Sequence, residues 1–436
     1  MPAPSDDPQL LAALPNGVRV LLLPLPGRPT ADVSVFVHTG SQNEDPRHSG
    51  ISHVVEHMAF KGTTTRDCQR INLDAEMLGA QVNAHTDKDH SAFHIVGLAG
   101  DAPAFVGMLA DIVRHGTFPA DELERERQVI LHELAEDEDD ALAEAFRRFD
   151  KLCYGPHPLA QPVIGRRRNI ERFTRDELLD YVGRQYTGAN TVVAVAGDVD
   201  ADAVLRAAEA GFGTMPAGAP NRVAPPAYLG GVATHAMSGS VQTHAVIGFP
   251  IPGLAGAHQA ATVAAALLGE GMSSPLMDEL RERRGLVYYA ACSADVLELA
   301  GQFVIEASTS LEHLDTFFAE VVRLLRAMAE RVPDADLQRA RRQIAVRELR
   351  ALERPSRRLE AAALDLFALQ RVRPRAETMA ALGAVTAAQV RDAFAAMRAA
   401  GATIAVAGKL KRGLDERVRE LAAPILQAAP AGPAPR

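Results

Sequence analysis

The chain of 436 residues is longer than one ordinary hydrophobic core requires, so we expect at least two domains. Apolar residues make up 47% of the sequence and charged residues 23%, which is typical of soluble globular proteins. The net charge of −9 is mild for this length and argues against a nucleic-acid-binding protein, leaving peptides and small molecules as partners.

The cysteines and the N-terminal segment bear on location. Cys68, Cys153 and Cys292 form neither a CxxC pair nor a disulfide framework, which favours a reducing compartment. Residues 1–17 are acidic and punctuated by proline, so we expect no signal peptide. The apolar runs also fall short of a membrane span. The sequence therefore predicts a cytoplasmic protein that does not bind membranes.

Strand-like apolar runs alternate irregularly with helical patterns in the first half of the chain. The connections are too irregular for a βαβ array, so we expect an α+β fold with a mainly antiparallel sheet packed against helices. The expected strands cover 18–25, 31–40, 90–99 and 190–198, and the expected helices cover 50–61, 66–79, 102–115, 120–148 and 174–184.

The helix expected over 50–61 carries two histidines and a glutamate. His53 and His57 are four positions apart and share one helical face, so both imidazoles can point at one ion. Two imidazoles and a carboxylate leave Zn²⁺ one open position and lower the pKa of its water to about 7. Glu56, next to His57, would take the proton of that water and pass it to the leaving amine. Because surface helices match H-x-x-E-H by chance, a metal site needs a third ligand.

The sequence HVVEH at 53–57, followed by ELERERQVILHELAED, resembles the pitrilysin-type (M16, inverzincin) zinc metallopeptidases. The resemblance implies one Zn²⁺ per chain with Glu133 as its third ligand. It also implies that Glu126, one heptad earlier on the same helical face, orients a ligand or the site without touching the metal. Glu136 is the alternative ligand, although its phase on the helix differs. The other interpretation of this acidic helix is a solvated face.

The segment GAQVNAHTDKDHSAFHIVGL, residues 79–98, also resembles the family. The resemblance implies that Asn83 and Ala84 begin an edge strand, to which an extended peptide substrate adds as a further strand. The alternative is a hairpin in which Asn83 caps a turn. We interpret His85, His90 and His94 as ordinary sheet residues, because the zinc ion already has three ligands.

The two halves of the chain repeat one another. VAVAGDVD at 193–200 matches IAVAGKLK at 404–411, and TRDELLDYV at 174–182 matches TAAQVRDAF at 386–394 with nearly the same spacing. The sequence therefore predicts two homologous tandem domains. The expected organisation is a zinc-binding M16-like domain over 1–214, a linker rich in Pro, Gly and Ala over 215–228, an M16-like domain without metal ligands over 229–424 and a disordered tail over 425–436.

The second half has no histidine pair where the repeat would place one, in 262–277, so it cannot build the same metal site. Its contribution lies in LRERRGLVYY, residues 280–289. The resemblance implies that Arg281 and Tyr288 approach the zinc site from the other domain, bind substrate and assist catalysis. A guanidinium can hold a substrate carbonyl, and a phenol can donate a hydrogen bond to an oxyanion. The alternative is a basic helix end followed by a buried tyrosine.

The resemblance implies a zinc-dependent endopeptidase that hydrolyses peptides or unstructured polypeptides. Family members of this length pair, so that Arg281 and Tyr288 of one subunit complete the zinc site of the other and the paired subunits enclose a chamber. A homodimer is expected, and a heterodimer with a metal-free homologue is the main alternative. Two further alternatives are a non-catalytic scaffold subunit and a partner-dependent subunit of a maturation peptidase for a small precursor peptide.

Overall fold

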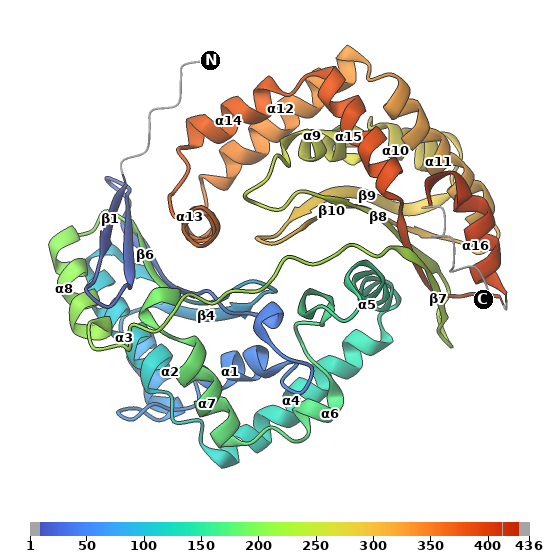
Figure 1. Ribbon diagram of the computed structural model, residues 1–436. Coiled ribbons are helices and arrows are strands. Elements are labelled where there is room, and N and C mark those ends of the chain that lie inside the picture. The colour runs from blue at the N-terminus through green and yellow to red at the C-terminus, as the bar shows by residue number, and fades with distance from the viewer. Residues whose placement is uncertain (1–8, 412, 427–436) are drawn as a thin grey trace, which may run out of the picture. The chain divides into compact units, whose positions relative to one another are not determined.

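The computed structural model describes residues 9–411 and 413–426 (Figure 1). The chain divides into two compact units, and both are discontinuous in the sequence. Unit 1 contains the described residues up to Ala135, then Gln161–Ala224 and Leu349–Ala376, and unit 2 contains Glu136–Ala160, Pro225–Glu348 and the described residues from Glu377 onward. Each unit therefore takes one short segment from the other half of the chain. The domain boundaries expected from the repeat stay a prediction.

Unit 1 is built around a six-stranded sheet. Its strands are β1 (Leu10–Ala13), β2 (Arg19–Pro24), β3 (Thr30–Val37), β4 (Gln81–Thr86), β5 (Ser91–Leu98) and β6 (Thr191–Gly197). Its helices are η1 (Ser41–Asn43), α1 (Ile51–Ala59), α2 (Cys68–Met77), η2 (Ala99–Asp101), α3 (Ala102–His115), most of α4 (Ala120–Asp139), α6 (Arg167–Ile170), α7 (Arg175–Gln185), η4 (Gly188–Asn190), α8 (Ala201–Phe212) and α13 (Pro355–Leu369).

The strand order of this sheet is β1-β2-β6-β3-β5-β4, and only the β2–β6 pair is parallel. Side chains alternate across the sheet, so β2 sends Val20 and Leu22 to one face and Leu21 and Leu23 to the other. Both faces are buried. Helices α1, α3 and α8 cover one face, and α13 covers the other against β3 and β6 (Figure 1).

Unit 2 is built around a five-stranded sheet. Its strands are β7 (Gly231–Ala236), β8 (Thr243–Ile251), β9 (Val287–Val296), β10 (Gly301–Thr309) and β11 (Thr403–Gly408). Its helices are α5 (Ala141–Tyr154), η3 (Pro158–Ala160), α9 (Gln259–Gly269), α10 (Pro275–Met277), the π-helical turn η5 (Asp278–Arg283), α11 (Leu314–Glu330), most of α12 (Asp334–Ala351), most of α14 (Arg375–Ala384), α15 (Ala387–Ala400), α16 (Leu414–Ala422) and η6 (Ala423–Ile425).

The sheet of unit 2 repeats the topology of the sheet of unit 1. Its order is β7-β11-β8-β10-β9, with β7–β11 as the parallel pair, so only β1 lacks a counterpart among the described strands. Helix α5 covers one face of this sheet, as α13 covers one face in unit 1, while α9 and α15 pack on the other. Helix α5 directly follows α4, and α13 directly follows α12. The two units thus hold equivalent helices that have been exchanged between the halves of the chain.

Most of the expected elements form where the sequence predicts them, and the α+β class with two mainly antiparallel sheets is confirmed. The single helix expected over 120–148 is wrong. Helix α4 ends at Asp139 and α5 begins at Ala141, because the carboxylate of Asp140 accepts hydrogen bonds from the amides of Leu142 and Ala143 and caps the new helix.

The expected linker and the described start of the expected tail can be compared with the structure. Residues 216–230 contain no helix or strand, and the two compact units meet in sequence at Ala224 and Pro225. In the expected tail, Ile425 is completely buried, and residues 427–436 lie outside the described part of the chain. Across residues 9–411 and 413–426, no helix combines the length and the apolar character that a membrane crossing requires.

Candidate metal centre

Helix α1 holds the two histidines of the motif, and its start is fixed by close backbone packing. Gly50 precedes the helix with φ 100°, in the left-handed region that favours glycine. A Cβ atom at Gly50 would lie 2.7 Å from the Cα of Gly165, which leaves no room for a side chain. On the inner face, Ile51, Val54, Val55 and Met58 are buried in the core of unit 1. The register of the helix is therefore set by apolar side chains and by the Gly50–Gly165 contact, and not by His53, Glu56 or His57.

A buried carboxyl group also holds the first turn of α1. Glu44 accepts hydrogen bonds from the amides of Gly50, at 2.7 Å, and Ser52, at 2.8 Å, which otherwise lack helical partners. Burial raises the pKa of Glu44 to about 8, although the hydrogen bonds from Gly50 and Ser52 oppose the shift. The hydroxyl of Ser52 lies 2.7 Å from that of Tyr181 on α7. These contacts orient the helix that presents His53 and His57.

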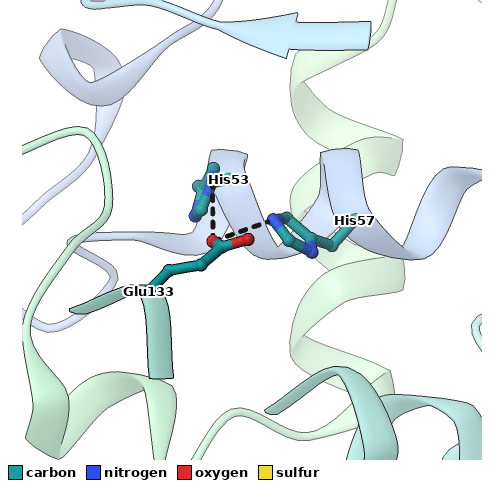
Figure 2. A group of neighbouring side chains, drawn as sticks. All are labelled: His53, His57 and Glu133. Carbon is teal, nitrogen blue, oxygen red and sulfur yellow. Dashed lines mark ion pairs between the residues drawn. The ribbon is translucent and has the colours of Figure 1, made fainter. Parts of the chain in front are cut away.

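His53, His57 and Glu133 come together between α1 and α4. The Oε2 atom of Glu133 lies 3.4 Å from His57 Nε2 and 3.9 Å from His53 Nε2, and Figure 2 shows the carboxylate facing both rings. The imidazole centroids are 4.6 Å apart. Each of the three residues offers one ligand atom, and all three atoms lie within 4.8 Å of one another. The helical spacing on α1 and the distant acid on α4 thus converge on one point.

This donor set fits Zn²⁺. Imidazole nitrogen and carboxylate oxygen are ligands that zinc binds readily, and a histidine ligand must be neutral. Burial and the neighbouring His57 lower the pKa of His53 to about 4, so its ring is neutral at pH 7. The Nδ1 atom of His53 is buried without a hydrogen-bond partner among the described residues.

Glu126 lies behind His57, one heptad before Glu133 on α4. Its Oε2 atom is 3.1 Å from His57 Nδ1, and its Oε1 atom is 2.6 Å from the Nζ of Lys61. Burial raises the pKa of Glu126, but the hydrogen bonds from Lys61 and His57 outweigh this effect, so the pKa lies below its ordinary value. A carboxylate here accepts the Nδ1 proton of His57 and leaves Nε2 free to bind an ion.

Glu56 does not belong to the triad and instead contacts strand β4 of the sheet. The Thr86 hydroxyl on β4 donates a 3.0 Å hydrogen bond to Glu56 Oε2. Burial raises the pKa of Glu56, while the hydrogen bond from Thr86 and the nearby His57 counteract part of the shift. The raised pKa means that Glu56 takes up a proton more readily than an exposed glutamate does, which a group that exchanges protons requires.

Asn83 and Ala84 lie on β4, which ends the sheet of unit 1, so one side of this strand pairs with no other described strand. Ala84 pairs with Phe93 on β5, and the side chain of Asn83 accepts a hydrogen bond from the Ala84 amide at 2.9 Å. The strand placement matches the expectation of an edge strand. Binding of a peptide to it stays a prediction.

Arg281 and Tyr288 belong to unit 2 rather than to the unit that holds the triad. Arg281 lies in the π-helical turn η5, and Tyr288 lies near the start of the edge strand β9 with 71% of its surface exposed. The alternative of a buried tyrosine is therefore wrong. The ladder pairs Val287 with Thr309 and Tyr289 with Ser308, so Tyr288 is the extra residue of a β-bulge. Such bulges redirect side chains and are frequent beside active sites.

The sequence did not reveal three contributors. Glu44, Lys61 and Thr86 act through contacts with residues far along the chain or on another element, and no spacing pattern connects them to the motif. The sequence left Glu136 as the alternative to Glu133 for the third metal ligand. The group of possible metal ligands contains Glu133 and not Glu136. Within the described residues, both groups able to hold a metal lie in unit 1.

Comparison with known proteins identifies the family of the chain. Residues 19–166 match the family model described as insulinase (peptidase family M16), and residues 172–344 match the model described as the peptidase M16 inactive domain. The chain belongs to the M16 peptidase family. An uncharacterized zinc protease of Rickettsia bellii is 30% identical over 336 residues, which cover 77% of this chain and 81% of that protein.

Two further comparisons cover different shares of the chain. The mitochondrial-processing peptidase subunit beta of Saccharomyces cerevisiae is 35% identical over 204 residues, 47% of this chain and 44% of that protein. A protease structure from Helicobacter pylori superimposes with a TM-score of 0.84 at 22% identity and covers 92% of this chain and 100% of that one. The first shows similarity over about half of the chain, and the second shows the shared fold.

Proposed function

We propose that this M16 chain is a zinc-dependent endopeptidase that hydrolyses peptides or unstructured polypeptides. The observation that supports the proposal is the convergence of His53, His57 and Glu133 to within 4.8 Å, next to a carboxylate that is not part of the triad. The name of the Rickettsia bellii relative, an uncharacterized zinc protease, agrees with this metal. One zinc ion at this triad is proposed for catalysis.

Each side chain of the site would have a separate role in hydrolysis. When bound by His53, His57 and Glu133, zinc would supply Lewis-acid chemistry that activates water and polarises a carbonyl. Glu56, oriented by Thr86, would accept a proton from the attacking water and return it to the leaving amine. Glu126 would fix the tautomer of His57 through Nδ1.

The edge strand β4 supports an extended substrate. We propose that a peptide pairs with β4 near Asn83 and Ala84, so that backbone hydrogen bonds hold it with little dependence on its side chains. Thr86 lies three residues farther along the same strand and contacts Glu56. A peptide on this edge would therefore run past the proposed base.

We propose that two subunits pair and enclose a chamber, with Arg281 and Tyr288 binding substrate and stabilising the oxyanion. The exposed position of Tyr288 in a β-bulge supports this role. A homodimer is the simplest assembly, because one chain carries both the triad and these two residues. We further propose that the halves 1–214 and 229–424 are duplicated domains, which the matching strand orders support.

A second candidate function is a partner-dependent or non-catalytic subunit, for example of a heterodimeric maturation peptidase for a small precursor. It is favoured by the similarity to a relative named as a subunit and by the inactive-domain model over 172–344. The complete set of His53, Glu56, His57 and Glu133 favours the endopeptidase.

The experiment compares the wild type with Glu56→Gln on a panel of unstructured peptides, with and without a chelator. We expect hydrolysis by the wild type that the chelator abolishes, and no hydrolysis by Glu56→Gln at unchanged zinc occupancy of the triad. Glu76→Gln, at an exposed position on α2, is the matched control and should cleave as the wild type does. A zinc-loaded wild type that cleaves no peptide would refute the endopeptidase and favour the subunit.

A further inference from the structure

A second cluster of possible metal ligands lies in unit 1, made of His85, His90 and Glu360. His85 is on β4, His90 immediately precedes β5, and Glu360 is on α13. No spacing pattern in the sequence links His85 and His90 to Glu360, which is 270 positions beyond His90, so the sequence alone predicts only the metal ion between α1 and α4. Glu360 joins them because α13, from the second half of the chain, covers the sheet of unit 1.

The three ligand atoms form a nearly equilateral triangle. His85 Nε2 lies 3.3 Å from His90 Nε2, and Glu360 Oε1 lies 3.5 Å from the first and 3.6 Å from the second. Two ligands that each lie 2.0–2.1 Å from a tetrahedral Zn²⁺ are about 3.4 Å apart. The spacing therefore matches three corners of a tetrahedral site, more closely than in the triad of His53, His57 and Glu133.

Contacts behind the ligands prepare His90 and Glu360 for an ion. The carboxylate of the buried Asp89 lies 2.8 Å from His90 Nδ1 and can accept its proton, which leaves Nε2 free. Arg357 donates a 3.0 Å hydrogen bond to Glu360 Oε2, so Oε1 is the oxygen that faces the histidines. Asp89 and Glu360 together offer two negative charges to a dication.

A chain of imidazoles fixes the tautomer of His85 in the same way. His94 Nδ1 lies 2.7 Å from Ser34 Oγ, and His94 Nε2 lies 3.0 Å from His85 Nδ1. If the Nδ1 proton of His94 is donated to Ser34, Nε2 of His94 accepts the Nδ1 proton of His85, and Nε2 of His85 is left with a free lone pair. Both histidines of the cluster thus have a partner behind the ring, whereas His53 Nδ1 has none among the described residues.

Burial also favours a metal. Only 2% of the His90 side chain and 17% of the Glu360 side chain are exposed, while 37% of His85 faces solvent. Phe36 packs against the ring of His90, with centroids 6.1 Å apart. Metal coordination strengthens where solvent is largely excluded, as it is around His90 and Glu360, and the partly exposed His85 keeps one side of the cluster open to solvent.

We propose that His85, His90 and Glu360 form a second metal site for a divalent first-row transition ion such as Zn²⁺. The role of this ion is structural, because it joins β4 and the start of β5 to α13. The adjacent residues His85 and Thr86 of β4 then contribute to two different sites. Thr86 contacts Glu56 beside the first triad on one face of the sheet, and His85 binds the second ion on the other face. This site does not depend on the proposed peptidase function.

The alternative is a metal-free network in which an imidazolium at His90 pairs with Asp89 and Glu360. The metal site and the metal-free network predict different amounts of bound metal per chain. We would load the full-length chain with Zn²⁺, dialyse it and measure zinc per chain by mass spectrometry. We expect close to two ions in the wild type, one in the double variant His53→Gln/His57→Gln and one in Glu360→Gln. His48→Gln, which alters a histidine elsewhere in unit 1, should keep two.

A second measurement identifies the ligands. The double variant His53→Gln/His57→Gln, titrated with Co²⁺, should show the visible absorption of one low-symmetry cobalt site, and adding Glu360→Gln should abolish it. Circular dichroism verifies that each variant is folded, and Glu360→Gln avoids the risk of replacing the buried His90. A folded double variant that takes up neither Zn²⁺ nor Co²⁺ would overturn the second site, as would a Glu360→Gln chain that keeps two ions. Two ions in a wild type that cleaves no peptide would support the site and refute only the proposed activity.

Discussion

The Oε2 atom of Glu126 lies 3.1 Å from the Nδ1 atom of His57, which joins the acidic face of α4 to the histidine pair of α1. The other carboxylate oxygen of Glu126 is held 2.6 Å from Lys61 Nζ. Only 12% of the Glu126 side chain is exposed, so this contact is shielded from water. The contact selects the tautomer of His57 that can bind a metal through Nε2.

Glu126→Gln should therefore weaken zinc binding at the triad by about 10- to 100-fold, as is usual when a partner behind a ligand is lost. The amide can still occupy the space but carries no charge. Competition with a fluorescent chelator measures the affinity, in a Glu360→Gln background that leaves one site. Glu124→Gln is the matched control, since Glu124 is on the same helix and pairs with Arg127. Equal affinities for the two variants would contradict the role of Glu126.

Thr86→Val should lower kcat/KM on peptides by about tenfold, because one hydrogen bond to Glu56 is worth about 1.5 kcal/mol when its partner is charged. Valine keeps the shape of threonine and removes the hydroxyl. Zinc content should not change. Thr86→Ser, which keeps the hydroxyl, is the control and should retain most of the activity. A Thr86→Val chain with normal kcat/KM would show that Glu56 needs no support from β4.

Tyr288→Phe should lower kcat much more than it raises KM, because a phenol that donates to an oxyanion acts in the transition state. Steady-state kinetics on one peptide separates the two constants. The neighbouring Tyr289 provides the control, since its hydroxyl donates a 2.5 Å hydrogen bond to Glu306 and is already engaged. Tyr289→Phe should leave kcat near its wild-type value. Small and equal changes in kcat and KM for Tyr288→Phe would remove it from the mechanism.

Glu44 should make stability depend on pH. Burial raises its pKa in the folded protein to about 8, while the carboxyl of an unfolded chain titrates near 4.5. The folded state therefore keeps a proton that the unfolded state has lost, and the free energy of unfolding should fall as pH rises from about 4.5 to about 8.

Urea unfolding of the metal-free protein at several pH values measures this dependence. Glu44→Gln should flatten the slope, because the amide does not titrate, while weakening one of the two hydrogen bonds to the start of α1. Glu76→Gln, at an exposed carboxyl, should keep the wild-type slope. A Glu44→Gln variant with the full wild-type slope would show that another group is responsible.

Local patterns in the sequence predicted much of the fold and the triad. The four-residue spacing of His53 and His57 depends only on helix geometry, and resemblance to the family placed Glu133. The break at Asp140 was missed, because the acidic run on both sides of it continues a helical pattern and only the cap geometry shows the end of α4.

The contacts that the sequence could not reveal join distant segments. His90 meets Glu360 only because α13 packs on β3 and β6, and no local pattern indicates that α13 leaves the half of the chain in which it is encoded. Glu44 looks like a loop acid until the amides of Gly50 and Ser52 are seen to surround it. Predicting these contacts requires knowing how helices and strands that are distant in the sequence pack against one another.

The exchange of α5 and α13 has a consequence for proteolysis. A protease that cuts the irregular segment 216–230 would not release two independent folded halves, because the N-terminal piece would lack Leu359 and Leu366, which cover the apolar face of its own sheet. The C-terminal piece would likewise lack Phe149, which covers its sheet. Separating the two pieces would expose the face of the unit 1 sheet that α13 covers and the face of the unit 2 sheet that α5 covers. Cutting one peptide bond in 216–230 should therefore leave the two pieces associated.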